Sequence, residues 1–202
     1  MAKTRTFVAI DTDDAMRRRA SGLIDRLRPY APQARWVQEE NLHLTLLFMG
    51  DLSDSEIAET CSRVDWVCRA NQPFTLRLAG VGAFPDASRP KAVWLGATEG
   101  AEPLSRLHSD LDDALGDLAA RGENRAFVPH LTLARVGGRG QGSKGKGGGG
   151  VSEHLPEVLM GLADYDAGTL SVDAVTVFAS ELRREGPEYQ PLARCRLGMG
   201  EE

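Results

Sequence analysis

The tetrapeptide His43-Leu44-Thr45-Leu46 recurs as His130-Leu131-Thr132-Leu133, and it uses two of the four histidines of the 202-residue chain. In each copy polar and apolar residues alternate, which is typical of a β-strand with one face against a core. Alternation places the histidine and the threonine of each copy side by side on one face. The repeat therefore predicts two equivalent strands, each presenting an imidazole and a hydroxyl group.

Further elements are predicted on both sides of the two copies. Runs rich in β-branched and aromatic residues predict strands, the two copies included, at residues 5–10, 42–48, 74–84, 91–97, 129–136, 169–179 and 189–197. Capping residues and helical periodicity predict helices from Asp11-Thr12-Asp13 to about Arg28, from Ser53 to about Ala70, over 103–121 and over 152–162. This order predicts an α+β fold with two similar lobes.

Composition narrows the class of protein. Hydrophobic residues make up 42% and charged residues 26%, the usual mix of a globular protein, and the length suits one domain of two lobes. No run of about 20 apolar residues predicts a membrane span, and the apolar run at the N-terminus is too short for a signal peptide. We therefore expect a cytoplasmic protein. The three cysteines, Cys61, Cys68 and Cys195, form no CxxC pair, which favours free thiols.

The net charge of −5 argues against attraction of nucleic acid over the whole surface. A polyanionic ligand must then be bound by a local patch or contacted only at its end.

Two imidazoles with two hydroxyls suit phosphoryl chemistry. One imidazole can take a proton from water while the other protonates the leaving oxygen, because histidine titrates near pH 6.5. Each histidine could instead be an ordinary strand residue, but the duplication favours the catalytic interpretation. A metal site is less favoured, because each strand offers one imidazole with no carboxylate or thiol at a ligand spacing. We expect neither a metal ion nor a cofactor.

Several stretches spread along nearly the whole chain carry a resemblance to a known family. They are Arg5-Thr6-Phe7-Val8-Ala9-Ile10-Asp11, Arg35-Trp36-Val37, Glu40-Asn41-Leu42-His43-Leu44-Thr45-Leu46, Phe48-Met49-Gly50, Gly80-Val81-Gly82-Ala83-Phe84-Pro85, Val93-Trp94-Leu95-Gly96, Pro129 through Val136, Ser180-Glu181-Leu182 and Gly186-Pro187-Glu188-Tyr189. In these stretches the chain resembles the two-histidine (2H) phosphoesterases, and among them the bacterial RNA 2′,3′-cyclic phosphodiesterases, also called LigT-like proteins or 2′-5′ RNA ligases.

The resemblance implies a fold and a reaction. The fold is α+β and bilobal, a single 2H phosphoesterase (LigT-like) domain over 1–202 in which two similar antiparallel sheet-plus-helix lobes flank a central cleft. The reaction is metal-free hydrolysis of a 2′,3′-cyclic phosphate to a 2′-phosphomonoester. His43 is the implied proton donor to the leaving 3′ oxygen, His130 the implied base that activates water, and Thr45 and Thr132 the implied phosphate-binding residues.

The implied partners are RNA 3′ ends bearing a 2′,3′-cyclic phosphate or small cyclic nucleotides, with no membrane, and we expect a monomer. Arg135 resembles a basic residue that follows the second histidine motif in the family. Simple alternation from His130 places Arg135 on the opposite face from Thr132, so a role at the phosphate requires a bulge or a strand end there. A solvated charge at the end of a strand is the alternative.

The remaining aromatic residues and histidines have weaker signals. Trp36, Phe48, Trp94 and Tyr189 could stack on a base, but core positions are the favoured interpretation. His108 and His154 lie in helix candidates without a threonine partner, and we expect both on the surface.

Residues 137–150 depart from the family pattern with a glycine-rich insertion. One stretch of the insertion is a near match to the P-loop motif: Gly140-Gln141-Gly142-Ser143-Lys144-Gly145-Lys146. Gly147 follows it where a Mg²⁺-binding hydroxyl is needed, so a nucleoside triphosphatase is not predicted. We expect a flexible loop. Its cations Arg139, Lys144 and Lys146 could contact RNA phosphates upstream of the 3′ end.

Two alternatives to cyclic phosphodiester hydrolysis remain open. One is another 2H reaction, either ligation through a 2′-5′ bond or hydrolysis of small cyclic nucleotides, because the same four side chains would serve. The other is an RNA-end binding module without turnover, against which the two intact histidines weigh. Turnover of a 2′,3′-cyclic dinucleotide end, with identification of the product phosphate, would separate them.

Overall fold

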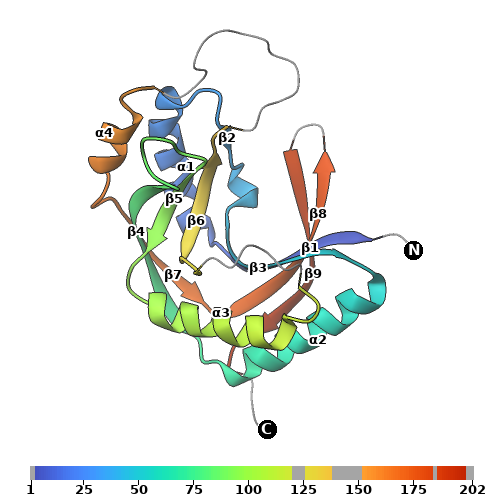
Figure 1. The fold of residues 1–202 in the computed structure, drawn as a ribbon. Coiled ribbons are helices and arrows are strands. Elements are labelled where there is room, and N and C mark those ends of the chain that lie inside the picture. Colours follow the sequence, from blue (N-terminus) through green and yellow to red (C-terminus); the bar gives the residue numbers. More distant parts are fainter. Residues whose placement is uncertain (1–2, 120–125, 138–151, 184–185, 199–202) are drawn as a thin grey trace.

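The fold is built on two antiparallel sheets, each with helices packed on it (Figure 1). It is seen in a computed structural model that describes residues 3–119, 126–137, 152–183 and 186–198. The predicted insertion at 137–150 lies outside the described residues, apart from Gly137. The architecture is the expected α+β class with two sheet-plus-helix lobes.

The first lobe contains a four-stranded sheet in the order β3-β1-β8-β9. Its strands are β1 (Thr4–Asp11), β3 (His43–Leu52), β8 (Ala174–Arg183) and β9 (Gly186–Arg196). Among the described residues, the strand that carries the first histidine is therefore an edge strand whose one neighbour in the sheet is β1.

The second lobe contains a five-stranded sheet in the order β2-β6-β5-β4-β7. Its strands are β2 (Arg35–Trp36), β4 (Phe74–Phe84), β5 (Ala92–Ala97), β6 (His130–Arg135) and β7 (Asp166–Val172). The strand that carries the second histidine is separated from the edge only by the two residues of β2.

Helices begin where the sequence offers capping side chains. Asp13 accepts a hydrogen bond from the backbone NH of Met16 at the start of α1 (Asp14–Leu27). Ser53 and Glu56 form a capping box at the start of α2 (Asp54–Ala70), as the sequence predicted. The other helices are α3 (Ala101–Leu115), α4 (Leu155–Met160) and the short 3-10 helices η1 (Arg28–Tyr30) and η2 (Glu39–Asn41).

The main core lies between the helices and the sheets. α1 packs against β6 and β7 of the five-stranded sheet, α2 packs against the four-stranded sheet, and α3 lies beside α2 at the bottom of Figure 1. Leu44 and Leu46 from the first histidine motif, and Leu131 and Leu133 from the second, are all buried in this core. The alternation of each motif therefore turns its histidine and threonine away from the core, onto the other face of its sheet.

Three features of the fold differ from the sequence-based prediction. The predicted strand 169–179 is two strands that meet at Asp173, and they belong to different sheets. The predicted helix 103–121 ends at Leu115, because Gly116 weakens the helix and the amides of Leu118 and Ala119 both turn back to the Leu115 carbonyl. β2 was not predicted as a strand.

In the part of the chain that the structure describes, no helix is both long and apolar enough to span a membrane.

Candidate active site

His43 is the first residue of β3 and lies directly opposite Asp11 on β1. Its Nδ1 atom is 2.7 Å from the backbone carbonyl oxygen of Asn41, so in the neutral ring Nδ1–H donates to that oxygen. Nε2 is then the acceptor atom, and the hydroxyl of Thr45 donates to it at 3.0 Å. Local hydrogen bonding therefore fixes which ring nitrogen is available for proton transfer.

Aromatic rings enclose the His43 imidazole. The ring centroids of Phe7 and Tyr189 lie 4.9 Å and 5.2 Å from it, and the Tyr189 ring stands edge-on at 88°. Phe178 stacks on Phe7 at 5.2 Å. Phe7 and Phe178 form a small buried cluster of their own, separate from the main core. This cluster orients the imidazole and excludes water from one side of it.

Burial is the main cause that lowers the pKa of His43 below its ordinary value. The Asn41 carbonyl and the negative charge of Asp11 oppose this effect and raise the pKa, whereas the positive charge of Arg135 lowers it. The carboxylate of Asp11 is held by the Thr176 hydroxyl, which donates to it at 2.6 Å. Asp11 is therefore a fixed negative charge that favours the protonated form of His43.

His130 repeats the contact between Nδ1 and a backbone carbonyl at the start of β6. Its Nδ1 atom is 2.7 Å from the carbonyl oxygen of Val128, again two residues earlier in the chain. Phe84 stands edge-on to the ring at 87° with a centroid distance of 5.1 Å. Burial lowers the pKa of His130, the Val128 carbonyl raises it, and the charge of Arg135 lowers it. The main electrostatic difference from His43 is that no carboxylate raises this pKa.

A β-bulge in β6 decides where Arg135 lies. In the pairing with β5, Val93 is opposite Ala134 and Trp94 is opposite Thr132, so Leu133 has no partner. Leu133 and Ala134 are consecutive and both are buried. The bulge shifts the alternation by one residue, and Arg135 emerges on the face that carries His130 and Thr132. The structure therefore contains the bulge that Arg135 requires for a role at the phosphate.

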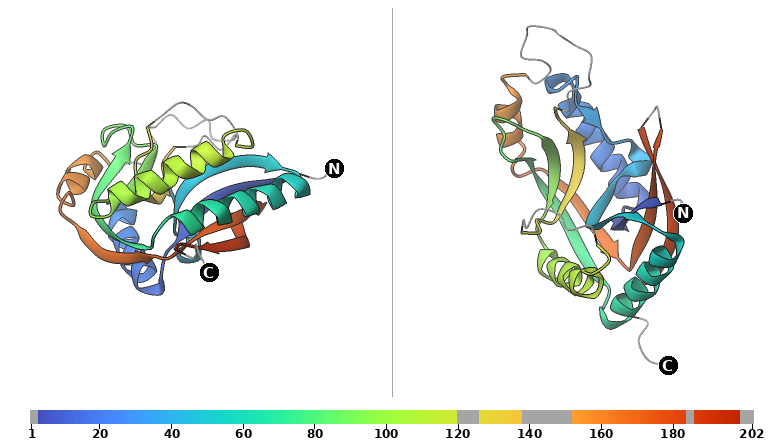
Figure 2. Two further views of the ribbon diagram at one scale, coloured as in Figure 1. Left: turned by 90° about the horizontal axis from the view of Figure 1, so that it is seen from below. Right: turned by 45° about the vertical axis from the view of Figure 1, so that its right-hand side comes forward.

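Arg135 also relates the two lobes to each other. Its charge lowers the pKa of both imidazoles, and it opposes the rise that burial causes in the pKa of Tyr189. β3 and β6, which begin with His43 and His130, are in contact where the two sheets meet (Figures 1 and 2). The structure thus brings both histidine motifs and Arg135 into one electrostatic environment.

Thr132 faces Trp94 across β5 and β6. The Trp94 ring lies flat over Gly82 of β4, where an added Cβ would meet ring carbons at 2.3 Å and 2.4 Å. Trp94 and Tyr189 are partly buried beside the histidines and are not members of the main core, contrary to the core expectation. Phe48 is 53% exposed, and Trp36 alone of the four is a core residue, with its indole NH bonded to the Ala31 carbonyl.

Two further residues at this site were missed by sequence reasoning. Asp11 was interpreted as a strand end and helix cap, and only the β1–β3 register places it opposite His43. Asn41 supplies the carbonyl that orients His43, and its side-chain amide donates to the Pro187 carbonyl at 2.9 Å, which ties η2 to the β8–β9 hairpin. Each carbonyl partner lies two residues before its histidine, and this shared spacing is the feature of the sequence that could have indicated both partners.

The other two histidines lie elsewhere. The ring of His108 stacks on Phe127 at 3.9 Å and is partly buried, which corrects the expectation of a surface residue. His154 is exposed on the N-terminal side of α4, as expected. Among the described residues, no group of three or more histidine, cysteine or acidic side chains could hold a metal ion. The cysteines are free thiols.

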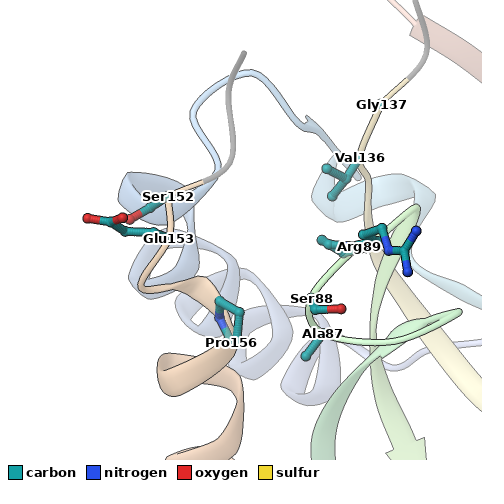
Figure 3. A pocket seen from close by; sticks show the side chains of 9 residues that line it. Ala87, Ser88, Arg89, Val136, Gly137, Ser152, Glu153 and Pro156 are labelled. Carbon is teal, nitrogen blue, oxygen red and sulfur yellow. The ribbon is translucent and has the colours of Figure 1, made fainter. Parts of the chain in front are cut away.

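The hollow drawn in Figure 3 lies beyond the end of β6 and does not include either histidine motif. It is bounded by the turn between β4 and β5, by Val136 and Gly137, and by the residues that lead into α4. Its lining contains Ser88 and Arg89 from the turn, and the Arg89 side chain points away from α4. The hollow therefore lies next to the histidine site, at the end of the strand that carries Arg135.

Comparison with known proteins gives the family. Residues 13–141 match a family model described as the 2′-5′ RNA ligase superfamily, and residues 95–189 match one described as LigT-like phosphoesterase. The chain belongs to the 2′-5′ RNA ligase superfamily. Membership confirms the family resemblance and the bilobal α+β fold that it implied.

Individual members of the superfamily are similar over nearly the whole chain. A protein of Methanothermobacter thermautotrophicus named RNA 2′,3′-cyclic phosphodiesterase is 33% identical over 96% of this chain and 100% of its own. A Thermus thermophilus crystal structure is 26% identical, with a TM-score of 0.76 and coverage of 98% and 100%. Escherichia coli LigT in complex with 3′-AMP is 27% identical, with a TM-score of 0.71 and coverage of 96% and 98%.

Proposed function

We propose that this protein hydrolyses 2′,3′-cyclic phosphodiester ends of RNA to 2′-phosphomonoesters. The observation that carries the proposal is the duplicated arrangement of His43 and His130. Each imidazole presents Nε2 for proton transfer because Nδ1 is bonded to a backbone carbonyl, and the two strands meet between the lobes. Relatives of similar length that bear the name RNA 2′,3′-cyclic phosphodiesterase support the same reaction.

In the proposed reaction a water molecule attacks phosphorus while Nε2 of neutral His130 accepts its proton. The bond between phosphorus and the 3′ oxygen breaks, and that oxygen takes a proton from Nε2 of protonated His43. The products are a 2′-phosphomonoester, a free 3′ hydroxyl, neutral His43 and protonated His130. His130 then loses its proton to solvent and His43 takes one up, which restores the starting state. The chemistry is general acid–base catalysis by two imidazoles, the side chain whose ordinary pKa lies closest to neutral pH.

The assignment of the acid has an electrostatic reason. Asp11 raises the pKa of His43, and no carboxylate is among the causes that act on His130. The Asp11 carboxylate thus favours the protonated form at His43, which suits the proton donor, while burial without a nearby carboxylate favours the neutral form at His130, which suits the base.

Thr45, Thr132 and Arg135 would hold the phosphate. The Thr45 hydroxyl lies at the reactive nitrogen of His43, and Thr132 and Arg135 lie on the His130 face of β6. Hydroxyl and guanidinium groups donate hydrogen bonds to the non-bridging oxygens, where negative charge grows in the transition state.

The deciding experiment is turnover of a dinucleotide that ends in a 2′,3′-cyclic phosphate, with the product identified by phosphorus NMR. We expect a 2′-phosphate, formed at the same rate with and without EDTA. A 3′-phosphate product, or loss of turnover in EDTA that a divalent cation restores, would contradict the mechanism. Binding without turnover would indicate an RNA-end binding module, and formation of a 2′-5′ linked product with an added 5′-hydroxyl oligonucleotide would indicate ligation.

A further inference from the structure

An arginine on β2 lies directly opposite Arg135. In the β2–β6 pairing Arg35 is the register partner of Arg135, while the buried Trp36 is the partner of the buried Ala134. Arg35 and Arg135 are therefore on the same face, away from the core, and both are exposed. This is the face on which His130 and Thr132 lie.

Two like charges directly opposite on neighbouring strands repel each other, since their Cβ atoms are typically about 5 Å apart. Among the described residues, no carboxylate lies within ion-pair distance of either guanidinium. Arg63 and Arg69 show the contrast, because each contacts carboxylates, at 2.5 Å and 2.8 Å. The arginine pair is thus a local positive patch in a protein whose net charge is −5.

The position of the patch relates it to the reacting phosphate. Arg135 acts electrostatically on both imidazoles, whereas Arg35 lies one strand further out, on the edge strand that leads through η2 to His43. An anion bound by Arg35 would lie beside the anion bound by Arg135. Because a 2′,3′-cyclic phosphate ends the RNA chain, a second phosphate of the same strand can only come from the 5′ side.

We propose that Arg35 binds the phosphodiester that joins the terminal nucleotide to the one before it, so that the site distinguishes an RNA strand from a free cyclic mononucleotide. This inference rests on the proposed function, because it requires the cyclic phosphate to lie at the two histidines. It explains why two arginines that have no carboxylate partner among the described residues face each other at the edge of the sheet: the RNA backbone supplies their counter-charge.

The test compares three substrates in the full-length wild-type protein and in Arg35→Gln. They are a 2′,3′-cyclic mononucleotide with a free 5′ hydroxyl, a dinucleotide ending in the same cyclic phosphate, and that dinucleotide with an uncharged methylphosphonate linkage. We expect Arg35→Gln to lower kcat/KM for the natural dinucleotide about tenfold, the usual scale for a hydrogen bond to a charged group. The mononucleotide and the methylphosphonate should be unaffected.

Salt dependence gives a second readout. Loss of one phosphate contact should make the slope of log kcat/KM against log salt shallower by about 0.7 for the dinucleotide. Arg35→Lys should recover part of the dinucleotide rate. The matched control is Arg196→Gln, which removes an exposed arginine of β9 that lines a small hollow beside α2. It should leave all three substrates and the salt slope unchanged.

The outcomes separate this inference from the proposed function. If the wild type turns over none of the three substrates, the proposed function fails. If it turns over all three and Arg35→Gln affects none or all equally, the inference alone is overturned. An equal loss on all substrates would place Arg35 at the reacting phosphate, and no loss would leave it as a charge that protects the sheet edge from pairing with other chains. If Arg35→Gln folds poorly, the wild type still tests the inference, because equal turnover of the natural and methylphosphonate dinucleotides would overturn it.

Discussion

At the scale of single residues, each candidate catalytic imidazole is oriented by a carbonyl oxygen two positions earlier in the chain. His43 bonds to Asn41 and His130 bonds to Val128, both at 2.7 Å. The repeat thus extends beyond the tetrapeptide to the backbone geometry at the start of each strand. What differs is the charged surroundings, with Asp11 near His43 only. Two imidazoles that share one backbone contact but differ in their neighbouring charge suit opposite proton-transfer roles.

Replacement of either histidine tests these roles. We expect His43→Ala and His130→Ala each to lower kcat about 10²–10⁴-fold, the usual contribution of a general acid or base. The double variant should lose far less than the product of the two single losses, because the residues act as a unit. The control is His154→Ala, since that side chain is 64% exposed. Near-normal turnover by either single variant would refute the assignment.

The pH dependence follows from the directions of the two pKa shifts. Burial lowers the pKa of both imidazoles below 6.5. The base loses activity as pH falls through its pKa, and the acid loses activity as pH rises through its own. We therefore expect a bell-shaped pH profile of kcat/KM, the parameter that reports on the free enzyme, centred below pH 6.5. The two apparent pKa values of this profile belong to the pair of histidines and not to either residue alone. A profile that is flat between pH 5 and 9 would contradict the scheme.

The bound phosphate should move this profile. Its negative charge stabilises the protonated imidazole and raises that pKa, so the profile of kcat should lie at higher pH than that of kcat/KM. Arg135→Gln removes the charge that lowers both histidine pKa values. We expect that variant to be slower and to have its kcat/KM profile displaced to higher pH.

At the scale of elements, the local form of the strands determines which side chains reach the site. The bulge at Leu133 turns Arg135 to the histidine face, and β2 adds Arg35 beside it. On the same face a row of partners runs from Gly82 through Trp94 to Thr132. Gly82 is required there because the indole occupies the space of a side chain.

Gly82→Ala tests that packing. Its Cβ would lie 2.3 Å from the Trp94 ring, so the indole must move, at a cost of about 1–3 kcal/mol. We expect a lower Tm in thermal unfolding, together with a loss of turnover because Thr132 is the neighbour of Trp94. Gly22→Ala is the control: nothing lies within 4 Å of its added Cβ in α1, and it should stabilise by about 0.5–1 kcal/mol. Unchanged Tm and turnover in Gly82→Ala would show that the indole is free to shift.

At the scale of the whole molecule, the two lobes share one large core that the helices close. Cys68 and Cys195 lie in it, and burial raises the pKa of their thiols to about 12 and about 11. Burial also raises the pKa of the partly buried Cys61. Since the thiolate is the reactive form, the raised pKa values make these thiols weak nucleophiles near neutral pH.

Thiol accessibility therefore reports on the integrity of both lobes. With a thiol-specific reagent at pH 8, we expect slow reaction of the folded protein and fast reaction of all three cysteines in guanidinium chloride. Turnover should not change with added reductant. Fast modification of Cys68 or Cys195 in the native state would mean that the lobes open readily, and it would contradict the packed core.

The sequence by itself determined the strands of the histidine motifs, the helix caps at Asp13 and Ser53, and the face on which each histidine and threonine lies. These features depend on periodicity and on side chains a few residues away, so they are readable without knowledge of distant partners. The prediction of four site residues from the duplicated motif, His43, Thr45, His130 and Thr132, rested on this local information alone, and their roles stay a prediction.

Only the tertiary structure decided which other residues join them. The bulge that presents Arg135, the placement of Asp11 opposite His43, and the pairing of Arg35 with Arg135 all depend on strand register. Residues 169–179 are likewise divided between two sheets because the two halves pair with different strands. Register and bulges are set by hydrogen bonds between strands that are distant in sequence. No local pattern encodes them, which is why Asp11 and Arg35 emerged only from the fold, and why only the fold placed Arg135, a candidate from the family resemblance, on the histidine face.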